Sequence, residues 1–347
     1  MRLFLIEPHA GGRISGGYLY NARMAESEGS LERRAVRPGH LAADLLALEL
    51  PAPAWVLADS LFLNVEHMAA FQQLRQRSGL RLGLLLHAFP SFIRRAEDRS
   101  LLAHSLPLRP SAAELALLAQ LDLLVAPGPY VPRLLLECGS PVATAICPPG
   151  VDPIPAEGSA PPRSPGPVQL ISIGSVTPLK GLLDAAAALS RLGPADFCWT
   201  IVGHLGVTPE HVAELQQRIA TLGLAARVVF AGQLGHAQTL AALRRSDLLI
   251  LTSFTENHPL VALEALAARV PVVGYAVGGL PDIIRNGVSG LLSPLLDVPR
   301  LTENLARLMA EAGERQRLSE GCAVAAGSLM TWGEAARHFV QTLRARA

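Results

Sequence analysis

The chain has 347 residues, of which half are hydrophobic and 17% are charged, and its formal net charge is +1. This composition excludes a disordered or fibrous chain, and the charge gives no general attraction to nucleic acid. The length suits two α/β domains, because single domains usually contain roughly 100–200 residues.

The cysteines and the apolar runs indicate the compartment. The four cysteines are far apart, so neither a zinc site nor a disulfide framework is predicted. Every apolar run meets a charge or a proline before the roughly 18 residues that a spanning helix needs. Met1–Glu7 reaches a glutamate too early for a signal peptide and predicts a first strand. We therefore expect a cytoplasmic protein.

Short apolar runs alternate with longer helical stretches, which predicts βα units and parallel sheets. The strands expected in the first half are Arg2–Ile6, Ala54–Ala58, Arg81–His87, Leu121–Ala126 and Ala143–Cys147. Those expected in the second half are Val168–Gly174, Cys198–Gly203, Arg227–Ala231, Asp247–Thr252 and Val270–Tyr275. Ligands of such sheets bind beyond the carboxyl ends of the strands.

A segment rich in proline, glycine and serine, Pro153–Pro167, separates the two series of strands. Such composition is typical of a linker. Thr331–Ala347 carries apolar residues at helical spacing and predicts an amphipathic helix. The predicted fold is α/β, with two Rossmann-like, doubly wound domains at residues 1–152 and 153–330. The helix at 331–347 is expected to return to the N-terminal domain.

Lys180 is the one lysine among 30 basic residues. It lies in Thr177–Gly181, just past the strand that is expected to end at Gly174. A loop before a helix N-terminus is a natural place for an ammonium group to hold phosphate. The alternative is a surface lysine that remains by chance in an arginine-biased sequence.

Two glutamates, Glu256 and Glu264, stand eight positions apart in an otherwise apolar stretch. Glutamates are rarely buried without partners, and a carboxylate in an apolar helix can accept hydrogen bonds from vicinal hydroxyls of a sugar. Pro259 suits an early helical position, so residues 256–260 are expected to form a turn with free N–H groups. Alternatively, Glu256 is a helix N-terminal charge that interacts with the macrodipole.

Several of these segments, in this order, resemble the donor-site signature of family 4 retaining glycosyltransferases (glycosyl transferases group 1), which have the GT-B fold. The donor signature is Glu256-x7-Glu264 followed by Gly278–Asp282. Upstream, Pro148–Asp152 resembles the family's interdomain turn, and Val176–Gly181 resembles its phosphate-binding loop. The resemblance covers residues 145–300. It implies a C-terminal donor-binding domain that faces an acceptor-side N-terminal domain across a cleft.

The resemblance also implies roles for single residues. Lys180 would contact the donor diphosphate, Glu264 the ribose hydroxyls and Glu256 the transferred sugar, with His87, Lys180 and Glu256 as catalytic residues. The further implied donor-binding residues are Gly16, Gly17, Ser175, Gly232, Gln233, Leu234, Asn257, His258, Pro259 and Leu260. Ser175 stands where many members of the family have an arginine.

Three features of the first half have alternative interpretations. The glycine loop at residues 11–18 lacks the order of a dinucleotide fingerprint, and the resemblance implies that Gly16 and Gly17 face the donor diphosphate. His87 ends a predicted strand and resembles the family's active-site histidine, whereas a lone histidine is usually structural. The basic group Arg94, Arg95 and Arg99 either positions an anionic or membrane-bound acceptor or is a solvated helix face.

The implied activity is a retaining, hexosyltransferase-type transfer from a nucleoside diphosphate sugar to a glycan, lipid-linked or small-molecule acceptor. No carboxylate is placed as a nucleophile, which favours front-face substitution in which the leaving phosphate receives the acceptor proton. No Asp-x-Asp motif occurs, so we expect no cofactor and no required metal. The alternatives are a sugar-nucleotide epimerase and a non-catalytic sugar-nucleotide-binding protein. We expect no nucleic-acid partner, and peripheral contact with the inner face of the membrane if the acceptor is lipid-linked.

Overall fold

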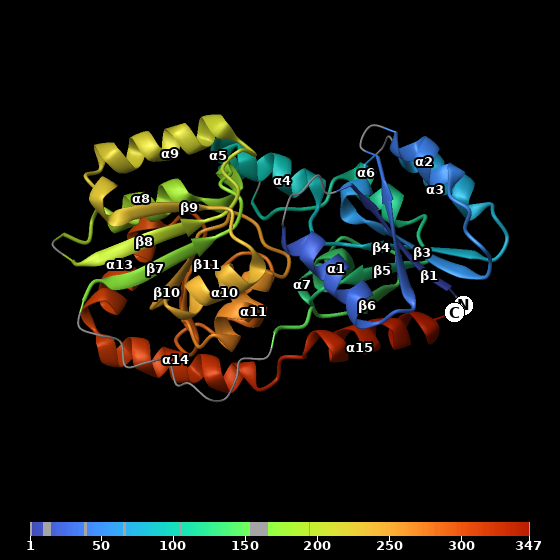
Figure 1. Ribbon diagram of the computed structural model, residues 1–347. Helices are drawn as coiled ribbons and strands as arrows, with labels where there is room; N and C mark the ends of the chain where they lie inside the picture. Colours follow the sequence, from blue (N-terminus) through green and yellow to red (C-terminus); the bar gives the residue numbers. More distant parts are fainter. Residues whose placement is uncertain are drawn as a thin grey trace. The chain divides into compact units, whose positions relative to one another are not determined.

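The computed structural model describes residues 2–346 except 10–14, 38–39, 65–66, 105, 153–165 and 194. The side chains of Leu41, Ala42, Leu45, Met68, Phe71 and Arg99 also lie outside the described part. The chain divides into two compact units (Figure 1). Unit 1 comprises Met1–Gly150 and Met330–Ala347, and unit 2 comprises Val151–Leu329.

Unit 1 contains a six-stranded sheet in the order β2-β1-β3-β4-β5-β6, in which every neighbouring pair is parallel. The strand order reverses between β1 and β3, so the carboxyl ends of these two strands flank a topological switch point. The strands are β1 (Arg2–Pro8), β2 (Leu31–Val36), β3 (Ala54–Asp59), β4 (Leu80–Leu85), β5 (Leu123–Ala126) and β6 (Thr144–Ile146).

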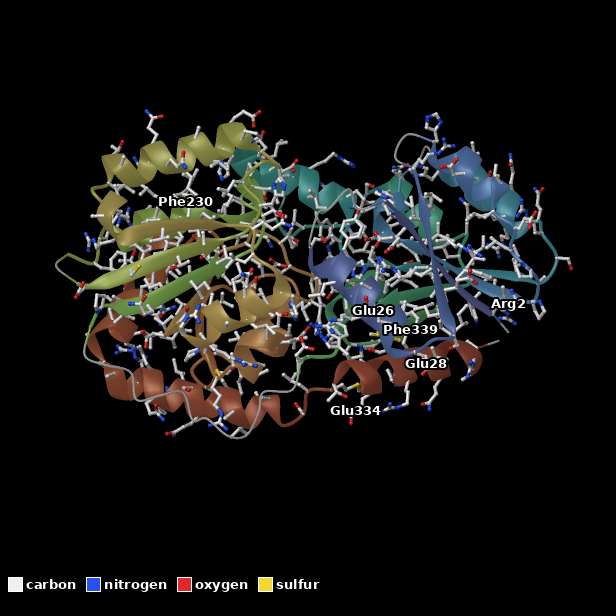
Figure 2. The ribbon with its side chains drawn as sticks, viewed as in Figure 1. Arg2, Glu26, Glu28, Phe230, Glu334 and Phe339 are labelled. Atoms are coloured by element: carbon white, nitrogen blue, oxygen red, sulfur yellow. The ribbon has the colours of Figure 1, made fainter. Side chains whose placement is uncertain are left out.

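The helices of unit 1 include the C-terminal one, which returns to this unit. Tyr20 of α1 makes edge-on ring contacts with Trp332 and Phe339 of α15, and Trp55 Nε1 donates a hydrogen bond to Leu343 O. Phe339 points toward α1, whereas Glu334 lies on the outer side of α15 (Figure 2). The helices are α1 (Gly16–Ser27), α2 (Leu41–Ala47), α3 (Met68–Arg75), α4 (Pro90–Glu97), α5 (Arg99–His104), α6 (Ala112–Leu118), α7 (Tyr130–Glu137) and α15 (Trp332–Arg344).

Unit 2 contains a second parallel six-stranded sheet, in the order β12-β11-β10-β7-β8-β9. This is the strand order of a dinucleotide-binding Rossmann sheet, and its switch point lies between β7 and β10. The strands are β7 (Val168–Ile173), β8 (Phe197–Val202), β9 (Val228–Gly232), β10 (Leu248–Leu251), β11 (Val272–Tyr275) and β12 (Gly290–Ser293).

A buried cluster in unit 2 joins its sheet to helix α11. Leu249 and Leu251 of β10 and Val272 of β11 are buried in one cluster with Ala262 and Leu266 of α11. The helices are α8 (Leu182–Leu189), α9 (Pro209–Thr221), α10 (His236–Arg244), α11 (Leu260–Ala267), α12 (Leu280–Ile283), α13 (Val298–Ala310) and α14 (Ala312–Ala326).

The predicted fold class of two doubly wound α/β domains is confirmed, with differences in detail. Each predicted strand is present, with its ends within two residues of those expected. Two strands were missed. β2 reads Leu-Glu-Arg-Arg-Ala-Val and is an edge strand whose four central residues are exposed, so it lacks an apolar run. β12 is a buried strand of four residues and is too short to be recognised directly after the turn that begins at Gly287.

Candidate functional site

In unit 2, two loops meet at the switch point between β7 and β10. Phe254 N donates a hydrogen bond to Leu179 O at 2.9 Å, and Thr252 Oγ1 donates to Lys180 O at 3.0 Å. Gly181 has φ +59°, and a Cβ atom there would lie 2.1 Å from Thr252 O. Glycine is therefore required for this close approach, which fixes the Lys180 loop against the loop after β10.

Lys180 and Glu256 form an ion pair at this junction, with 2.7 Å between Lys180 Nζ and Glu256 Oε1. Both side chains keep part of their surface exposed, 25% for Lys180 and 14% for Glu256. The backbone of Glu256 is held by the next loop, because Gly279 N donates to Glu256 O at 2.8 Å. Gly278 has φ +53°, and a Cβ atom there would lie 1.9 Å from Glu256 O. The structure thus brings together two residues that the sequence singled out separately.

The loop that carries Glu256 contains polar atoms without partners. Ser253 Oγ, Asn257 Nδ2 and His258 Nδ1 are buried and make no hydrogen bond within the described part of the chain. Burial lowers the pKa of His258 to about 4, although Asp282 opposes this shift, so the ring is neutral at pH 7. An unpaired buried polar atom costs about 1–3 kcal/mol. Three such atoms within six residues indicate a place where a polar ligand completes the hydrogen bonding.

Helix α11 begins directly after these atoms. It begins at Leu260 with Pro259 as its N-cap, directly after the turn that was predicted at residues 256–260, and no described side chain caps it. The first N–H groups of a helix lack intrahelical partners and favour negative charge. A pocket lined by Gly174, Lys180, Thr252 and Ser253, among others, opens beside the same loops. The segment from Asn257 to Leu260 therefore carries unpaired polar atoms beside the start of a helix, and its role as a sugar and phosphate cradle stays a prediction.

Glu264 lies on α11 with 10% of its side chain exposed, and it has a histidine neighbour that the sequence analysis missed. His236 Nδ1 is 3.7 Å from Glu264 Oε1, while His236 Nε2 is 2.7 Å from Asp152 Oδ2. His236 begins α10, directly after the loop predicted to hold the nucleobase. Its position two residues after Leu234 was the signal that could have drawn attention to it.

The other residues of unit 2 that were predicted to bind the donor lie near strand ends. Gly232 is the last residue of β9 with φ +69°, and Gln233 and Leu234 connect it to α10. Ser175 follows Gly174 in the loop after β7. A Cβ atom at Gly174 would lie 3.0 Å from Lys180 Cε, so the lysine stem passes over this glycine.

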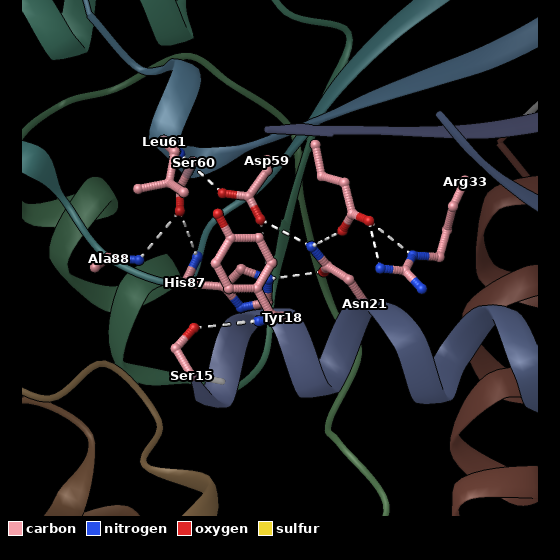
Figure 3. Close-up of polar contacts among 10 residues, drawn as sticks. Ser15, Tyr18, Asn21, Arg33, Asp59, Ser60, Leu61, His87 and Ala88 are labelled. Atoms are coloured by element: carbon pink, nitrogen blue, oxygen red, sulfur yellow. Dashed lines mark hydrogen bonds and ion pairs between the residues drawn. The ribbon is translucent and has the colours of Figure 1, made fainter. Parts of the chain in front are cut away.

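In unit 1, His87 lies two residues beyond β4 rather than at its end as predicted, in a network of buried polar groups (Figure 3). His87 Nε2 is 2.9 Å from Asn21 Oδ1 and 3.7 Å from Asp59 Oδ2. The backbone N–H of His87 donates a hydrogen bond to Ser60 Oγ. Burial lowers the pKa of His87, whereas Asp59 and Glu7 raise it. The network connects His87 with the carboxyl ends of β1 and β3.

The predicted glycine loop differs from the structure. Gly16 and Gly17 are the first residues of α1, which is capped by the Ser15 side chain, and residues 10–14 lie outside the described residues. A Cβ atom at Gly17 would lie 3.0 Å from His87 Cδ2. Gly17 therefore allows α1 to approach the histidine ring, a role within unit 1 that the sequence analysis did not foresee.

The basic group Arg94, Arg95 and Arg99 is described only in part. Arg95 Nη1 donates to Arg109 O, and Arg94 is exposed on α4, while the Arg99 side chain is outside the described part. Among the described residues, no group of three or more His, Cys, Asp or Glu side chains is arranged to hold a metal ion. No helix in the described part of the chain has the length and apolarity needed to cross a membrane.

Comparison with known proteins identifies the family of the segment that contains Lys180, Glu256 and Glu264. The family model described as "Glycosyl transferases group 1" matches residues 158–322. These residues belong to that family. The match includes the loop of Lys180, the Glu256–Glu264 segment and Gly278–Gly279, which the resemblance had singled out.

Curated relatives match part of the chain. The chain is 38% identical over 156 residues to a D-inositol 3-phosphate glycosyltransferase of Salinispora tropica, which covers 43% of this chain and 32% of the relative. A glycosyltransferase of the same name from Geodermatophilus obscurus is 34% identical over 246 residues, 66% of this chain and 54% of the relative. A Mycobacterium tuberculosis glycogen synthase is 34% identical over 158 residues, which are 44% of this chain and 36% of the relative. The chain thus spans about a third to a half of the length of these relatives.

Solved structures resemble the whole chain in fold. A sucrose-phosphate synthase from Thermosynechococcus elongatus has a TM-score of 0.77 at 18% identity, covering 99% of this chain and 98% of the other. Anabaena HepE in complex with UDP-glucose has a TM-score of 0.76 at 18% identity, covering 99% of this chain and 100% of the other. At this identity the likeness establishes the GT-B fold and no more.

Proposed function

We propose that the protein is a retaining glycosyltransferase that transfers a sugar from a nucleoside diphosphate sugar to an acceptor hydroxyl. The observation that carries this proposal is the Lys180–Glu256 pair, which adjoins the unsatisfied atoms of Ser253, Asn257 and His258 at the switch point of unit 2. A cation, free N–H groups and unpaired polar atoms together suit a ligand that has both phosphate and hydroxyl groups. The match of this segment to glycosyl transferases group 1 supports the same assignment.

In the proposed reaction the bond between the anomeric carbon and the diphosphate oxygen breaks. Positive charge develops on the sugar and negative charge on the departing diphosphate, which Lys180 and the N–H groups at the start of α11 stabilise. The acceptor oxygen forms its bond on the same face of the sugar, and its proton passes to the leaving phosphate. This front-face route retains the anomeric configuration and needs no carboxylate nucleophile.

The carboxylates of unit 2 serve binding in this proposal. Glu264 accepts hydrogen bonds from the two ribose hydroxyls, and His236 lies between it and Asp152. Glu256 exchanges Lys180 for a sugar hydroxyl when the donor binds. His87 of unit 1 accepts a hydrogen bond from a substrate hydroxyl. We also propose that the reaction proceeds without a metal ion, since the cationic and N–H groups named above supply the charge stabilisation.

A nucleotide-release assay tests the proposal. The purified protein is incubated with UDP-, GDP- and ADP-sugars together with candidate glycan, lipid-linked and small-molecule acceptors, and free nucleoside diphosphate and sugar products are analysed. Release with one donor, with the anomeric configuration retained in the product, supports the proposal. A changed sugar that remains on the nucleotide would instead identify an epimerase, and donor binding without turnover would identify a non-catalytic binding protein.

A further inference from the structure

Asn21 of α1 connects His87 to two buried carboxylates (Figure 3). Asn21 is fully buried, and Glu7 and Asp59 are 4% and 3% exposed. Asn21 Nδ2 donates to Glu7 Oε2 at 3.0 Å and to Asp59 Oδ2 at 2.9 Å. Both N–H bonds of the amide are therefore used by carboxylates that lie at the ends of different strands.

This pairing fixes the orientation of the Asn21 amide. A carboxylate accepts hydrogen bonds, so the reversed amide would place Oδ1 against two acceptor oxygens and would leave both carboxylates without these donors. With Nδ2 toward Glu7 and Asp59, Oδ1 faces His87 Nε2 at 2.9 Å. An amide oxygen can only accept, so His87 Nε2 carries the hydrogen. In the neutral ring, Nδ1 then has the lone pair.

The other sides of the His87 ring are packed so that Nδ1 is the nitrogen left for a ligand. Gly17 adjoins the ring edge at Cδ2, and the ring of Tyr20 stands edge-on with 5.3 Å between centroids. Within the described part of the chain, Nδ1 makes no hydrogen bond. The His87 side chain keeps 16% of its surface exposed, which leaves access for a small group.

The two carboxylates near His87 have other hydrogen-bond donors within the network. Asp59 on β3 and Glu7 on β1 face the histidine and raise its pKa, while burial, the larger effect, lowers it. Arg33 on β2 bonds to Glu7 Oε1, and the Leu61 N–H donates to Asp59 Oδ1 at 2.9 Å. Both carboxylates thus have other donors, and neither needs a proton from His87.

We propose that Asn21 is a positioning residue that holds His87 as its Nε2–H tautomer, so that Nδ1 accepts a hydrogen bond from a substrate hydroxyl. The tautomer itself follows from the network, whereas the role of Nδ1 toward a hydroxyl rests on the proposed transferase function. The same lone pair disfavours a phosphate oxygen at this position. The assignment therefore distinguishes a hydroxyl-binding site in unit 1 from the phosphate-binding site proposed in unit 2.

Nuclear magnetic resonance of the ¹⁵N-labelled histidine rings tests the proposal directly. The His87 signals are identified by their loss in His87→Gln. We expect the wild-type ring to show the Nε2–H pattern at neutral pH. In Asn21→Asp a third carboxylate faces the ring, so the pKa of His87 measured by titration rises by about 1–3 units. The acidic limb of the pH profile of kcat/KM shifts to higher pH by the same amount.

The matched control is Asn304→Ala, which removes a buried asparagine that donates to Ser293 Oγ in unit 2. It should leave the His87 signals and pKa unchanged, whereas Asn21→Ala should change both. An Nδ1–H pattern in the wild-type protein would overturn the proposal, and so would an unchanged tautomer and pKa in Asn21→Ala. If Asn21→Asp fails to fold, the tautomer pattern of the wild-type His87 ring still tests the proposal. Absence of sugar transfer by the wild-type protein would contradict the proposed function without altering the tautomer result.

Discussion

Lys180 Nζ lies 2.7 Å from Glu256 Oε1, and this contact joins residues 76 positions apart in the sequence. The pair forms without any ligand, between the loop after β7 and the loop after β10. Partly exposed ion pairs contribute only about 0–1 kcal/mol, so a phosphate oxygen can replace the carboxylate at little cost. We infer that donor binding begins when Lys180 exchanges Glu256 for phosphate.

Glu256→Gln should separate binding from turnover. Loss of the carboxylate removes the competitor for Lys180, so the affinity for the nucleoside diphosphate should stay the same or rise by up to about fivefold. Turnover should fall by about 10- to 100-fold, because a charged hydrogen bond to the sugar is lost. Calorimetry and steady-state kinetics measure the two effects, with Glu303→Gln, an exposed ion-pair partner of Arg300, as control. A parallel loss of affinity and turnover would contradict the exchange.

Glu264→Ala should abolish the preference for ribose over deoxyribose. The wild-type protein should bind a nucleoside diphosphate more tightly than its 2′-deoxy counterpart, because the Glu264 carboxylate accepts from both ribose hydroxyls. In the variant the two ligands should bind with similar affinity. Glu214→Ala is the matched control, since Glu214 also pairs with a histidine in unit 2, at 3.0 Å from His211. If Glu264→Ala still preferred ribose over deoxyribose, Glu264 would not be the residue that binds the ribose hydroxyls.

Gly17→Ala should affect activity more than stability. Alanine favours a helix over glycine by about 1 kcal/mol, but its Cβ would lie 3.0 Å from His87 Cδ2 and would displace the ring. We expect kcat/KM to fall by about 2- to 10-fold with little change in the unfolding midpoint. At Gly29 an added Cβ meets nothing within 4 Å, so Gly29→Ala serves as control. Equal activities of the two variants would show that the His87 ring position is unimportant.

Removal of metal ions should leave the reaction intact. Lys180 and the N–H groups of α11 are proposed to stabilise the leaving diphosphate, and the sequence has no Asp-x-Asp motif. Turnover measured in EDTA should therefore equal turnover measured with added Mg²⁺ or Mn²⁺. A loss in EDTA that either ion restores would show that a metal takes part.

The sequence predicted those parts of the fold and site that depend on local pattern. Apolar runs located the buried strands other than β12, and glycines and prolines marked the loops of Lys180 and Glu256. Strand β2 was missed because its exposed Glu32, Arg33 and Arg34 mask the strand pattern. The same edge position brings Arg33 to Glu7, a contact that only the sheet order could reveal.

Contacts between distant segments could not be read from the sequence. Asn21, Asp59 and Ser60 had no motif to distinguish them, and they gather around His87 because β1, β3 and β4 end at one edge of a parallel sheet. His236 was likewise passed over, since its contact with Glu264 depends on the packing of α10 near α11. The roles of Gly232, Gln233 and Leu234 toward a nucleobase stay predictions.

The central claim is that the Lys180 loop of unit 2 holds the donor diphosphate, and calorimetry with UDP, GDP and ADP tests it most directly. We predict that one of these nucleotides binds the wild-type protein, that Lys180→Ala binds it about 10- to 100-fold more weakly, and that Arg191→Ala, which removes an exposed charge in unit 2, binds it unchanged. Binding of equal strength in Lys180→Ala, or no binding of any of the three to the wild-type protein, would contradict the account.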